Sequence, residues 1–471
     1  MKIKPKIILI LLAVLSVFNF NTVSYAESLP EVHAGSVVLG ELSTGKIIYS
    51  KNADEKMYPA SMTKILTALV AVDYYDYDSL ITVGDEVNQV PYDSSKAGHT
   101  RGETLSVLNL IRGLVIPSGN DTSAVIASAV AKKVSENSAL EYSECEKLFS
   151  GLMNKKAKDL GAFNSNFVNP HGYHDENHYS TANDIFKLSR VFCKNPTFME
   201  IAGESLYAGT GADKDLIEGT SLVVKNYYWK THNLLLTEGD YYYEYATGIK
   251  TGFTDEAGDC LIASAEKDGV SLIAVIFNSE DPNRWLDAIN LFEYGFNNYK
   301  FETVDLYGSI VDSASLKNQE KDFGDSVDVE IRKKVTLFLN KDELKNIERK
   351  ITYFPEYIYT PESGGDTPSE LTLKAPIEKL SPIGTIQYSV NGNILLDEEP
   401  VYSKYTVPES TKVNISEKIQ DMFKNLFTLK GLVILVLSAV ILIIIILIIS
   451  SMIKRRRHRV RRYSYRIRKK R

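Results

Sequence analysis

The chain has 471 residues, of which 44% are hydrophobic and 24% charged. These are ordinary values for globular protein, and the length allows two or three domains. The formal net charge of −6 hides an asymmetry: residues 454–471 carry twelve Lys and Arg and residues 1–26 carry three, which leaves −21 for residues 27–453. This acidic central region argues against nucleic acid as the partner of the folded part.

The first 26 residues have the pattern of a secretory signal peptide. Three lysines within the first six residues precede an apolar run from Ile7 to Phe18, and Ser24 and Ala26 are the small residues of a cleavage site. The alternative is an uncleaved anchor, but the apolar run is short for spanning a bilayer. We therefore expect cleavage after Ala26.

The region from residue 27 to residue 300 mixes the two types of secondary-structure pattern. Apolar residues at helical spacing predict helices at residues 61–72, 107–114 and 122–134. Short segments rich in Val and Ile predict strands at residues 36–39, 261–264 and 270–277. The region is therefore predicted to be one mixed α/β domain.

The pattern changes between residues 301 and 402. Short segments rich in aromatic and β-branched residues predict strands at residues 351–354, 357–359 and 385–390. Turn sequences lie at residues 362–366 and 391–393. We predict a small all-β domain here.

The C-terminal part has the pattern of a membrane anchor. In the linker at 403–430, apolar residues at helical spacing predict an amphipathic helix at the membrane surface, although a plain helical stalk fits equally well. An uncharged apolar segment from Leu432 to Ile453 is long enough to span a bilayer, so we predict a transmembrane helix at 431–453. The basic tail at 454–471 then lies in the cytoplasm, and the preceding domains lie outside.

The first candidate for chemistry is a serine and a lysine three residues apart. Ser61 and Lys64 follow Pro59 at a predicted helix start and share one face, so that the lysine amine can reach the hydroxyl. Burial lowers a lysine pKa and leaves the amine neutral, as a base must be, and a helix N-terminus offers N–H groups to an oxyanion. The spacing alone is weak evidence, because S-x-x-K recurs at Ser43, Ser264 and Ser451.

Two further motifs follow in the chain. Ser118-Gly119-Asn120 comes after Pro117 between two predicted helices, where a loop can present its side chains. Lys250-Thr251-Gly252 opens what we predict to be an edge strand of the sheet, and this K-T-G sequence occurs once in the chain. Each motif alone is weak evidence for a catalytic site, but their order along the chain and their positions at predicted helix starts and a strand edge make the combination informative.

In this order, S-x-x-K, S-x-N and K-T-G resemble the signature of penicillin-binding proteins and serine β-lactamases. The flanking sequences resemble the D-alanyl-D-alanine carboxypeptidases among the low-molecular-mass penicillin-binding proteins, at Tyr58–Lys64, Pro117–Asp121, His178–Ala182 and Gly248–Gly258. Leu373–Pro376 and Pro382–Ile386 resemble the β-sandwich domain that follows in those enzymes. The resemblance implies a β-lactamase/transpeptidase-like α/β (α+β) domain at 27–300, with an antiparallel sheet flanked by helices, and a small β-sandwich domain at 301–402.

The resemblance also implies the catalytic residues. Ser61 is the expected nucleophile on the carbonyl of the penultimate D-alanine, Lys64 its general base, and Ser118 the proton relay to the leaving D-alanine nitrogen. Asn120 is expected to hold the substrate amide and the lysine cluster in place. Water then hydrolyses the acyl-enzyme, so that a peptidoglycan stem pentapeptide loses its terminal D-alanine. β-Lactam antibiotics are the expected covalent inhibitors at the same serine.

The remaining expected site residues bind the substrate. Lys250 and Thr251 are expected to bind its terminal carboxylate, and Gly252 to let its backbone approach the strand. The backbone N–H of Phe253 is expected to complete the oxyanion hole with that of the nucleophile; some relatives have histidine there, so the leaving-group preference is in question. Arg284 resembles a family arginine near the carboxylate, although a surface arginine beside a tryptophan fits the sequence equally well.

Neither a metal site nor a cofactor is expected. His171, His174 and His178 have a spacing that suggests zinc, but a proline and a glycine between them break any helix, so the three side chains would not share a face. His178 is better interpreted as a structural hydrogen-bonding residue beside the active site. The three cysteines are too few for a disulfide framework and fit no zinc or haem pattern, so we expect Cys145, Cys193 and Cys260 to be core residues.

Two other functions compete with the carboxypeptidase. A serine β-lactamase needs a base poised for deacylation, and no clear Glu motif lies between Ser118 and Lys250. A non-catalytic membrane protein that binds the cell wall is compatible with a single span, but not with three intact motifs. If Lys64 is the base, activity falls as pH drops below its lowered pKa.

Overall fold

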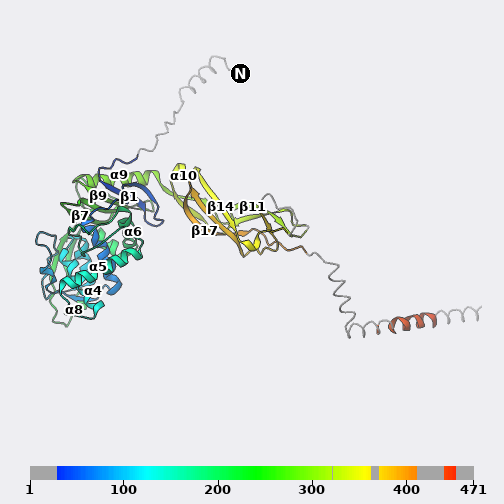
Figure 1. The fold of residues 1–471 in the computed structure, drawn as a ribbon, viewed down its shortest axis with the longest axis horizontal. Helices are drawn as coiled ribbons and strands as arrows, with labels where there is room; N and C mark the ends of the chain where they lie inside the picture. The colour runs from blue at the N-terminus through cyan, green and yellow to red at the C-terminus, as the bar shows by residue number, and fades with distance from the viewer. Residues whose placement is uncertain (1–28, 321, 362–370, 411–436, 438–439, 452–471) are drawn as a thin grey trace, which may run out of the picture. The chain divides into compact units, whose positions relative to one another are not determined.

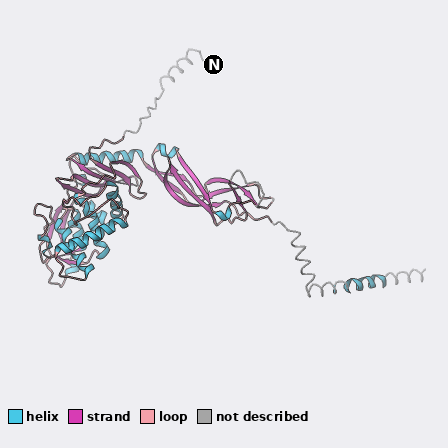
Figure 2. Cartoon of the chain, viewed as in Figure 1, coloured by secondary structure: helices cyan, strands magenta, loops and turns pink. Residues whose placement is uncertain are grey.

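The computed structural model describes residues 29–320, 322–361, 371–410, 437 and 440–451. One of its sheets has five strands, all antiparallel to their neighbours (Figures 1 and 2). In order across the sheet, the strands are β2 (Ile47–Lys51), β1 (Ser36–Glu41), β9 (Val270–Ser279), β8 (Gly258–Lys267) and β7 (Ala246–Thr254). The antiparallel sheet and the edge position of the K-T-G strand, both predicted from the sequence, are confirmed.

The two faces of this sheet are buried in two separate cores. Because side chains alternate along a strand, Val38 and Val275 enter one core while Leu39 and Ile276 enter the other. The second core is covered by α9 (Asn283–Asn298), which packs against β8, β9 and β1. A sheet covered on both faces explains why its strands are nearly continuous apolar runs.

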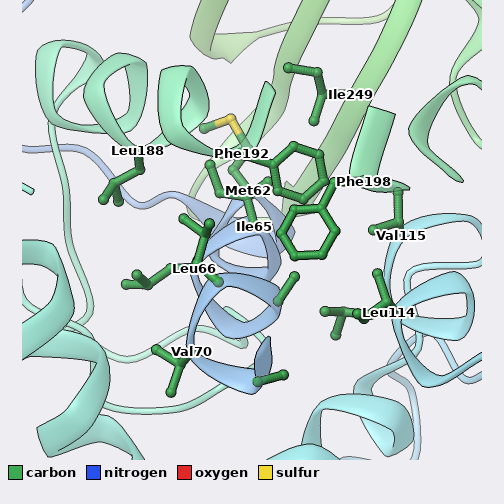
Figure 3. Packing of buried hydrophobic residues seen from close by; sticks show 14 of the residues in the cluster. Met62, Ile65, Leu66, Val70, Leu114, Val115, Leu188, Phe192, Phe198 and Ile249 are labelled. Carbon is green, nitrogen blue, oxygen red and sulfur yellow. The ribbon is translucent and has the colours of Figure 1, made fainter. Parts of the chain in front are cut away.

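Helices form the layer on the other face of the sheet. They are α2 (Lys64–Tyr74), α3 (Val107–Val115), α4 (Asn120–Ser135), α5 (Tyr142–Asp159), α6 (Ala182–Cys193) and α7 (Pro196–Gly203). Helix α2 lies at the centre of this layer, with eight of its eleven residues buried. Figure 3 shows Ile65 and Leu66 of α2 among side chains from its neighbours. Each fully buried side chain of this kind contributes about 1.5–3 kcal/mol, which fixes α2 and the residues at its start.

Short elements connect these layers. Two small antiparallel pairs are formed by β3 (Leu80–Thr82) with β4 (Thr104–Ser106), and by β5 (Leu206–Thr210) with β6 (Asn226–Lys230). The remaining short helical elements of this region are η1 (Ala60–Thr63), η2 (Asp85–Asn88), α8 (Lys214–Ile217) and η3 (Leu234–Leu236).

The chain from residue 300 is mainly β structure. A six-stranded sheet has the order β14-β16-β17-β12-β11-β15, and β10 pairs with β13. The strands are β10 (Lys300–Asp305), β11 (Ile310–Lys317), β12 (Ser326–Ile331), β13 (Val335–Leu339), β14 (Ile347–Tyr353), β15 (Thr372–Lys374), β16 (Pro382–Val390) and β17 (Asn393–Ser403). Helix α10 (Lys341–Lys345) and the 3₁₀ turn η4 (Pro355–Tyr357) interrupt them, so the region is not purely β.

One strand predicted in this region is wrong, and one turn is confirmed. The segment 357–359 begins in η4, and Ile358 makes a single bridge to Leu373, because Pro355 starts a helical turn before the aromatic residues. Between β16 and β17, Asn391 and Gly392 both have positive φ, as a tight hairpin turn requires. The predicted turn at 362–366 lies outside the described residues.

The described chain divides into two compact units. One contains the residues up to Leu306 together with Lys334–Lys350 and Gln387–Asp397, and the other contains Tyr307–Lys333, Ile351–Ile386 and the chain from Glu398. The predicted domain boundary after residue 300 rests on a change of sequence pattern, whereas the two units are defined by contacts in the structure. The two divisions differ because β10 pairs with β13, so that both strands belong to the first unit.

The predicted targeting segments fall largely outside the described residues. The signal peptide, the amphipathic helix and the basic tail all lie there. Within the predicted span, residues 440–451 are helical and exposed. Among the residues that the structure describes, no helix combines the length and the apolar character that crossing a membrane requires. The transmembrane helix therefore stays a prediction.

Candidate active site

Ser61 lies on a short 3₁₀ turn that leads directly into α2. The turn η1 spans Ala60–Thr63, and Lys64 is the first residue of α2. In a 3₁₀ turn, residues three apart are eclipsed, so the side chains of Ser61 and Lys64 point the same way. The predicted pair is thus brought together, with 2.7 Å between the lysine Nζ and the serine Oγ.

The surroundings of Lys64 leave its amine one free direction. Nζ donates hydrogen bonds to Asn120 Oδ1 at 2.7 Å and to the His171 carbonyl at 2.8 Å. A neutral amine has two N–H donors and one lone pair. With both donors engaged, the lone pair faces the Ser61 hydroxyl, which is the arrangement that a general base needs.

Burial keeps that amine neutral. Lys64 is fully buried, and this desolvation, followed by the positive charge of Lys250, holds its pKa well below the usual value; Asp121 opposes the shift. A lysine whose pKa is lowered in this way is more readily available as the acceptor of the serine proton. The sequence-based expectation of a neutral lysine therefore has a specific physical cause.

The S-x-N motif forms the wall opposite the sheet. Ser118 lies in the loop between α3 and α4 with φ 61°, a left-handed conformation that is costly for serine and that clusters at functional sites. Asn120 is the first residue of α4, so its side chain leaves the rigid end of a buried helix. Its backbone N–H donates to the Ser95 carbonyl at 2.8 Å, which ties this wall to the preceding loop.

The K-T-G motif lies on β7. Lys250 is 2% exposed and its Nζ donates to the Thr251 carbonyl at 2.9 Å, but no acidic side chain pairs with it in the described part of the chain. Burial and the nearby charge of Arg284 lower the pKa of Lys250 to about 7. A buried cation without a counter-ion favours an anionic ligand, and a substrate carboxylate meets that demand.

Gly252 and Phe253 continue the strand past the nucleophile. A Cβ at Gly252 would lie 3.1 Å from the Pro59 carbonyl oxygen and 3.2 Å from the Ser61 nitrogen, closer than ordinary van der Waals contact, so glycine lets β7 pass close to η1 without a shift of either segment. The Phe253 side chain is 58% exposed, consistent with a role confined to its backbone. Its N–H remains the predicted second oxyanion donor.

Arg284 lies beside the same cleft rather than at an open surface. Its guanidinium makes ion pairs with Asp259 at 2.6 Å and Asp281 at 3.0 Å, and stacks over the Trp285 ring at 4.4 Å. Both alternatives drawn from the sequence are therefore partly correct, since Arg284 packs on Trp285 and also lines the cavity.

One cavity of about 500 Å³ collects these residues. Its lining from the predicted site consists of Ser61, Ser118, Asn120, Thr251, Gly252, Phe253 and Arg284. Lys64 and Lys250 are buried below the cavity surface rather than in its lining. Three segments that are far apart in the sequence thus meet around one hydroxyl.

Comparison with known proteins gives the same result. A family profile described as D-alanyl-D-alanine carboxypeptidase (peptidase S11) matches residues 23–281, and the profile of the penicillin-binding protein 5 C-terminal domain matches residues 301–409. The chain is 30% identical to the D-alanyl-D-alanine carboxypeptidase DacF of Bacillus subtilis over 377 residues, which covers 79% of this chain and 85% of that protein. The chain belongs to the D-alanyl-D-alanine carboxypeptidase family. The predicted family is confirmed.

The fold of this chain is similar to those of two solved penicillin-binding enzymes. Penicillin-binding protein 5 of Haemophilus influenzae aligns with a TM-score of 0.58 over 81% of this chain and 99% of that one, at 23% identity, which shows the fold alone. The DD-transpeptidase of Streptomyces K15 aligns with a TM-score of 0.51 over 57% of this chain and 99% of that one, at 29% identity.

His178 has a structural role beside the active site. His178 Nε2 lies 2.9 Å from Thr63 Oγ1, and its Nδ1 accepts from the Val168 N–H at 3.2 Å, so the ring braces the residue that precedes Lys64. Burial lowers the pKa of His178 to about 3. No three metal-ligating side chains cluster among the described residues. All three cysteines are buried and unbridged.

Several residues of the site were not singled out from the sequence, and three of them support its geometry. Gly172 packs against η1, His232 lines the cavity, and Asp121 accepts hydrogen bonds from three successive backbone N–H groups, those of residues 97–99. For Gly172, the proline and glycine on either side of His171 indicated a non-helical loop, which was the one available signal. Nothing in the pattern around His232 indicated that it lies at the site.

Proposed function

We propose that this protein is a serine-type D-alanyl-D-alanine carboxypeptidase, which removes the terminal D-alanine from peptidoglycan stem pentapeptides and thereby tunes cell-wall cross-linking. The observation that carries the proposal is the buried Lys64 amine, 2.7 Å from the Ser61 hydroxyl with both of its N–H groups engaged elsewhere. Family membership and the three intact motifs support the same conclusion.

The first half of the reaction makes an acyl-enzyme. Lys64 takes the hydroxyl proton as Ser61 Oγ attacks the carbonyl carbon of the penultimate D-alanine. Backbone N–H groups of Ser61 and Phe253 stabilise the oxyanion. The C–N bond then breaks, and Ser118 relays a proton to the nitrogen of the departing D-alanine.

The second half returns the free enzyme. Water attacks the ester carbonyl, the oxygen of Ser61 leaves with a proton, and the shortened peptide is released. Until the C–N bond breaks, Lys250 and Thr251 hold the carboxylate of the terminal D-alanine, and Arg284 adds positive charge at the same end of the cavity. This explains why a terminal carboxylate is part of the recognised structure.

The same serine makes β-lactam antibiotics covalent inhibitors. A β-lactamase requires fast hydrolysis of the acyl-enzyme, and so needs a base for the water. In the described part of the chain, the hydrogen bonds of the Lys64 amine go to an amide oxygen and a carbonyl, and no carboxylate contacts it. The arrangement therefore favours a long-lived penicilloyl adduct over turnover.

Mass spectrometry of the purified protein with a stem pentapeptide tests the function. We expect loss of one alanine per peptide with the parent and none with Ser61→Ala. Penicillin should leave one covalent adduct on the parent and none on that variant. Rapid turnover of penicillin would favour the lactamase, and an intact pentapeptide with the folded parent would reject the carboxypeptidase.

We also propose that the protein is held in the cytoplasmic membrane by one C-terminal span, with the catalytic region on the cell-wall side. The uncharged segment Leu432–Ile453, followed by Lys454 and three arginines, supports this orientation. Leu447 and its helical neighbours expose apolar side chains that lipid would cover. Carbonate-washed membranes should retain the full chain, and recovery in the wash would reject the anchor.

A further inference from the structure

A separate cavity of about 570 Å³ lies where β5 and β6 meet the chain that follows η3. Cavities of this size are typical of sites for small ligands. None of the residues assigned to the reaction lines it. We call it the tyrosine cavity, and its lining consists of Ser205, Leu206, Tyr228, Lys230, Leu236, Thr237, Glu238 and Tyr242.

Two exposed tyrosine rings are its main feature. Tyr228 is 73% exposed and Tyr242 is 53% exposed. Among the described residues, neither ring packs on another aromatic ring and neither hydroxyl has a hydrogen-bond partner. A single exposed aromatic side chain is ordinary on a protein surface. Two in one cavity offer the same ligand two apolar faces with polar tips.

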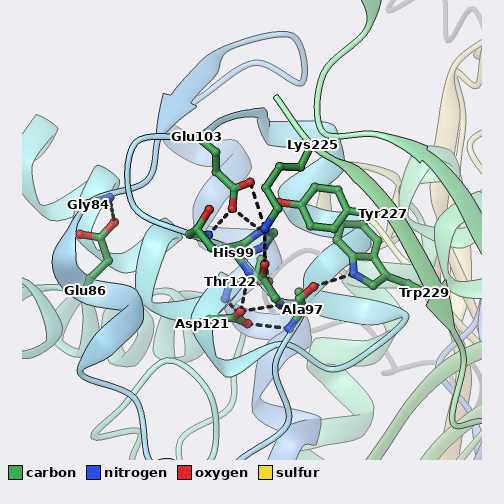
Figure 4. Close-up of polar contacts among 12 residues, drawn as sticks. Gly84, Glu86, Ala97, His99, Glu103, Asp121, Thr122, Lys225, Tyr227 and Trp229 are labelled. Atoms are coloured by element: carbon green, nitrogen blue, oxygen red, sulfur yellow. Dashed lines mark hydrogen bonds and ion pairs between the residues drawn. The ribbon is translucent and has the colours of Figure 1, made fainter. Parts of the chain in front are cut away.

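The first of these rings is carried by a strand that is held firmly. Side chains alternate along β6, so Tyr227 and Trp229 are buried while Tyr228 between them is exposed. Trp229 Nε1 donates to the Ala97 carbonyl at 2.9 Å, and Figure 4 shows both flanking rings directed into this polar cluster. The backbone that presents Tyr228 is therefore fixed from behind.

The second ring is positioned in the same way. The next residue, Tyr243, is buried, and its hydroxyl donates to Glu293 Oε1 at 2.8 Å. The Tyr243 backbone N–H donates to the Leu235 carbonyl at 3.0 Å, which closes the chain segment that carries Tyr242. Two fixed backbones thus hold two free rings at one cavity, as a preformed binding site requires.

The polar groups of the tyrosine cavity favour a neutral ligand with many hydroxyls. One cation, Lys230, and one anion, Glu238, line it and cancel in charge, and Thr237 adds a hydroxyl. None of these three side chains has a hydrogen bond or ion pair among the described residues. Free donors and acceptors beside exposed rings match a sugar, whose C–H faces cover aromatic rings and whose hydroxyl and amide groups need partners.

The tyrosine cavity connects to one particular end of the active site. Tyr228 and Lys230 also line a groove that contains His232, and His232 lines the catalytic cavity in turn. After burial, the charges of Lys250 and Arg284 are the causes that lower the pKa of His232, so His232 lies near the carboxylate-binding residues. The tyrosine cavity therefore lies beyond the carboxyl end of a bound stem.

The structure of the polymer then identifies which sugars reach this position. In peptidoglycan, each stem is joined to its own glycan strand through its amino end. An extended pentapeptide spans about 17 Å, so its carboxyl end points away from that strand. The sugars that lie beyond the carboxyl end belong to a neighbouring strand.

We propose that the tyrosine cavity binds a glycan strand next to the one whose stem is trimmed. The inference rests on the proposed carboxypeptidase function and deepens it, because the recognised substrate becomes the polymer rather than the stem alone. Binding is noncovalent, and the chemistry at Ser61 is unchanged. A bound strand raises the effective concentration of stems at the nucleophile, which lowers KM for polymeric peptidoglycan.

Titration with glycan strands from which the stems have been removed tests binding without any catalysis. The full chain is used in detergent, and calorimetry gives Kd. We expect Ser61→Ala to bind as the parent does, and Tyr242→Ala to bind about five- to tenfold more weakly because a stacking face is lost. Tyr307→Ala is the matched control, since it removes a ring that is 72% exposed outside the cavity, and should leave Kd unchanged.

Release of D-alanine from polymeric peptidoglycan and from a soluble pentapeptide tests the consequence. Tyr242→Ala should lower kcat/KM for the polymer about fivefold relative to the pentapeptide, and Tyr307→Ala should leave this ratio unchanged. If the parent trims the pentapeptide but does not bind stem-free strands, the inference is wrong and the carboxypeptidase stands. Equal binding by the parent and Tyr242→Ala would overturn the assignment to this cavity. Strand binding that depends on Tyr242 with an intact pentapeptide would instead reject the carboxypeptidase and keep the glycan site.

Discussion

At Lys64, two hydrogen-bond acceptors and one hydroxyl surround a single buried amine. The two acceptors, Asn120 Oδ1 and the His171 carbonyl, hold the N–H groups and so aim the lone pair at Ser61. Charge matters as much as direction, because a protonated amine has no lone pair to offer. The protonation state of this one residue therefore controls whether the site can react.

The rate of acylation should depend on pH through two lysines. Below the lowered pKa of Lys64 the amine is protonated, so acylation should fall about tenfold per pH unit on the acid side. Above about 7, the pKa of Lys250, that lysine loses its charge and carboxylate binding weakens, so KM should rise. Stopped-flow acylation by a β-lactam across pH checks both limbs, and Lys250→Arg should remove the alkaline one. An acid limb that stays flat would contradict the role of Lys64.

Adjacent residues of β7 should respond very differently to alanine. Gly252→Ala places a Cβ 3.2 Å from the Ser61 nitrogen and displaces an oxyanion donor, so acylation should fall about 10²-fold. Phe253→Ala removes an exposed ring but keeps the backbone N–H, so acylation should change less than about threefold. The two acylation rates give the comparison directly. Equal losses would mean that the Phe253 side chain, rather than its backbone, takes part.

Among the elements, the loop around Gly172 packs against the turn that carries the nucleophile. Gly172 has φ +81°, and a Cβ there would lie 1.8 Å from the Ala60 carbonyl oxygen, which is backbone and cannot give way. The preceding residue supplies the carbonyl that receives an N–H of Lys64. One loop thus supports both η1 and the base.

Gly172→Ala should therefore destabilise the fold and the site together. We expect a loss of about 3 kcal/mol in the free energy of unfolding and a marked fall in acylation. Gly269→Ala is the matched control, because Gly269 has φ +76° with open space around it and should lose about 1 kcal/mol without affecting acylation. Urea unfolding and β-lactam labelling measure the two effects. Similar stabilities for the two variants would show that the loop can move away.

The sequence predicted features that depend on a few neighbouring residues, but it did not predict features that depend on packing between distant segments. The S-x-x-K pair and the Asn391-Gly392 turn are short-range patterns, and the structure agrees with both. The Tyr357–Tyr359 segment has strand composition, but the preceding proline starts η4 and overrides it. The wall beside His232 forms where β6 meets the Ser95–Gly98 loop, which lies more than 100 residues earlier in the chain, and no periodicity in the sequence encodes this contact.

For the whole molecule, the proposed topology separates anchoring from catalysis. The described β region ends at residue 410, and the predicted span begins some twenty residues later. All residues of the catalytic cavity lie between Ser61 and Arg284. None of the described residues of the predicted span lines this cavity.

A chain ending at residue 410 should consequently be released from the membrane without losing activity. We expect D-alanine release from a soluble pentapeptide within about twofold of the full chain, because no catalytic contact is removed. Fractionation and a D-alanine assay on the same preparations provide the measurement. A released chain that is folded but inactive would show that the C-terminal part supports the site.

The edge position of β7 has a consequence for which molecules the enzyme can accept. Of the described strands, β8 alone pairs with β7, so main-chain groups along its outer margin are available to an incoming extended peptide, which would lie there as a guest strand. Hydrogen bonds between main chains depend little on which side chains the bound peptide carries. We therefore expect the site to accept stem peptides that differ in their side chains.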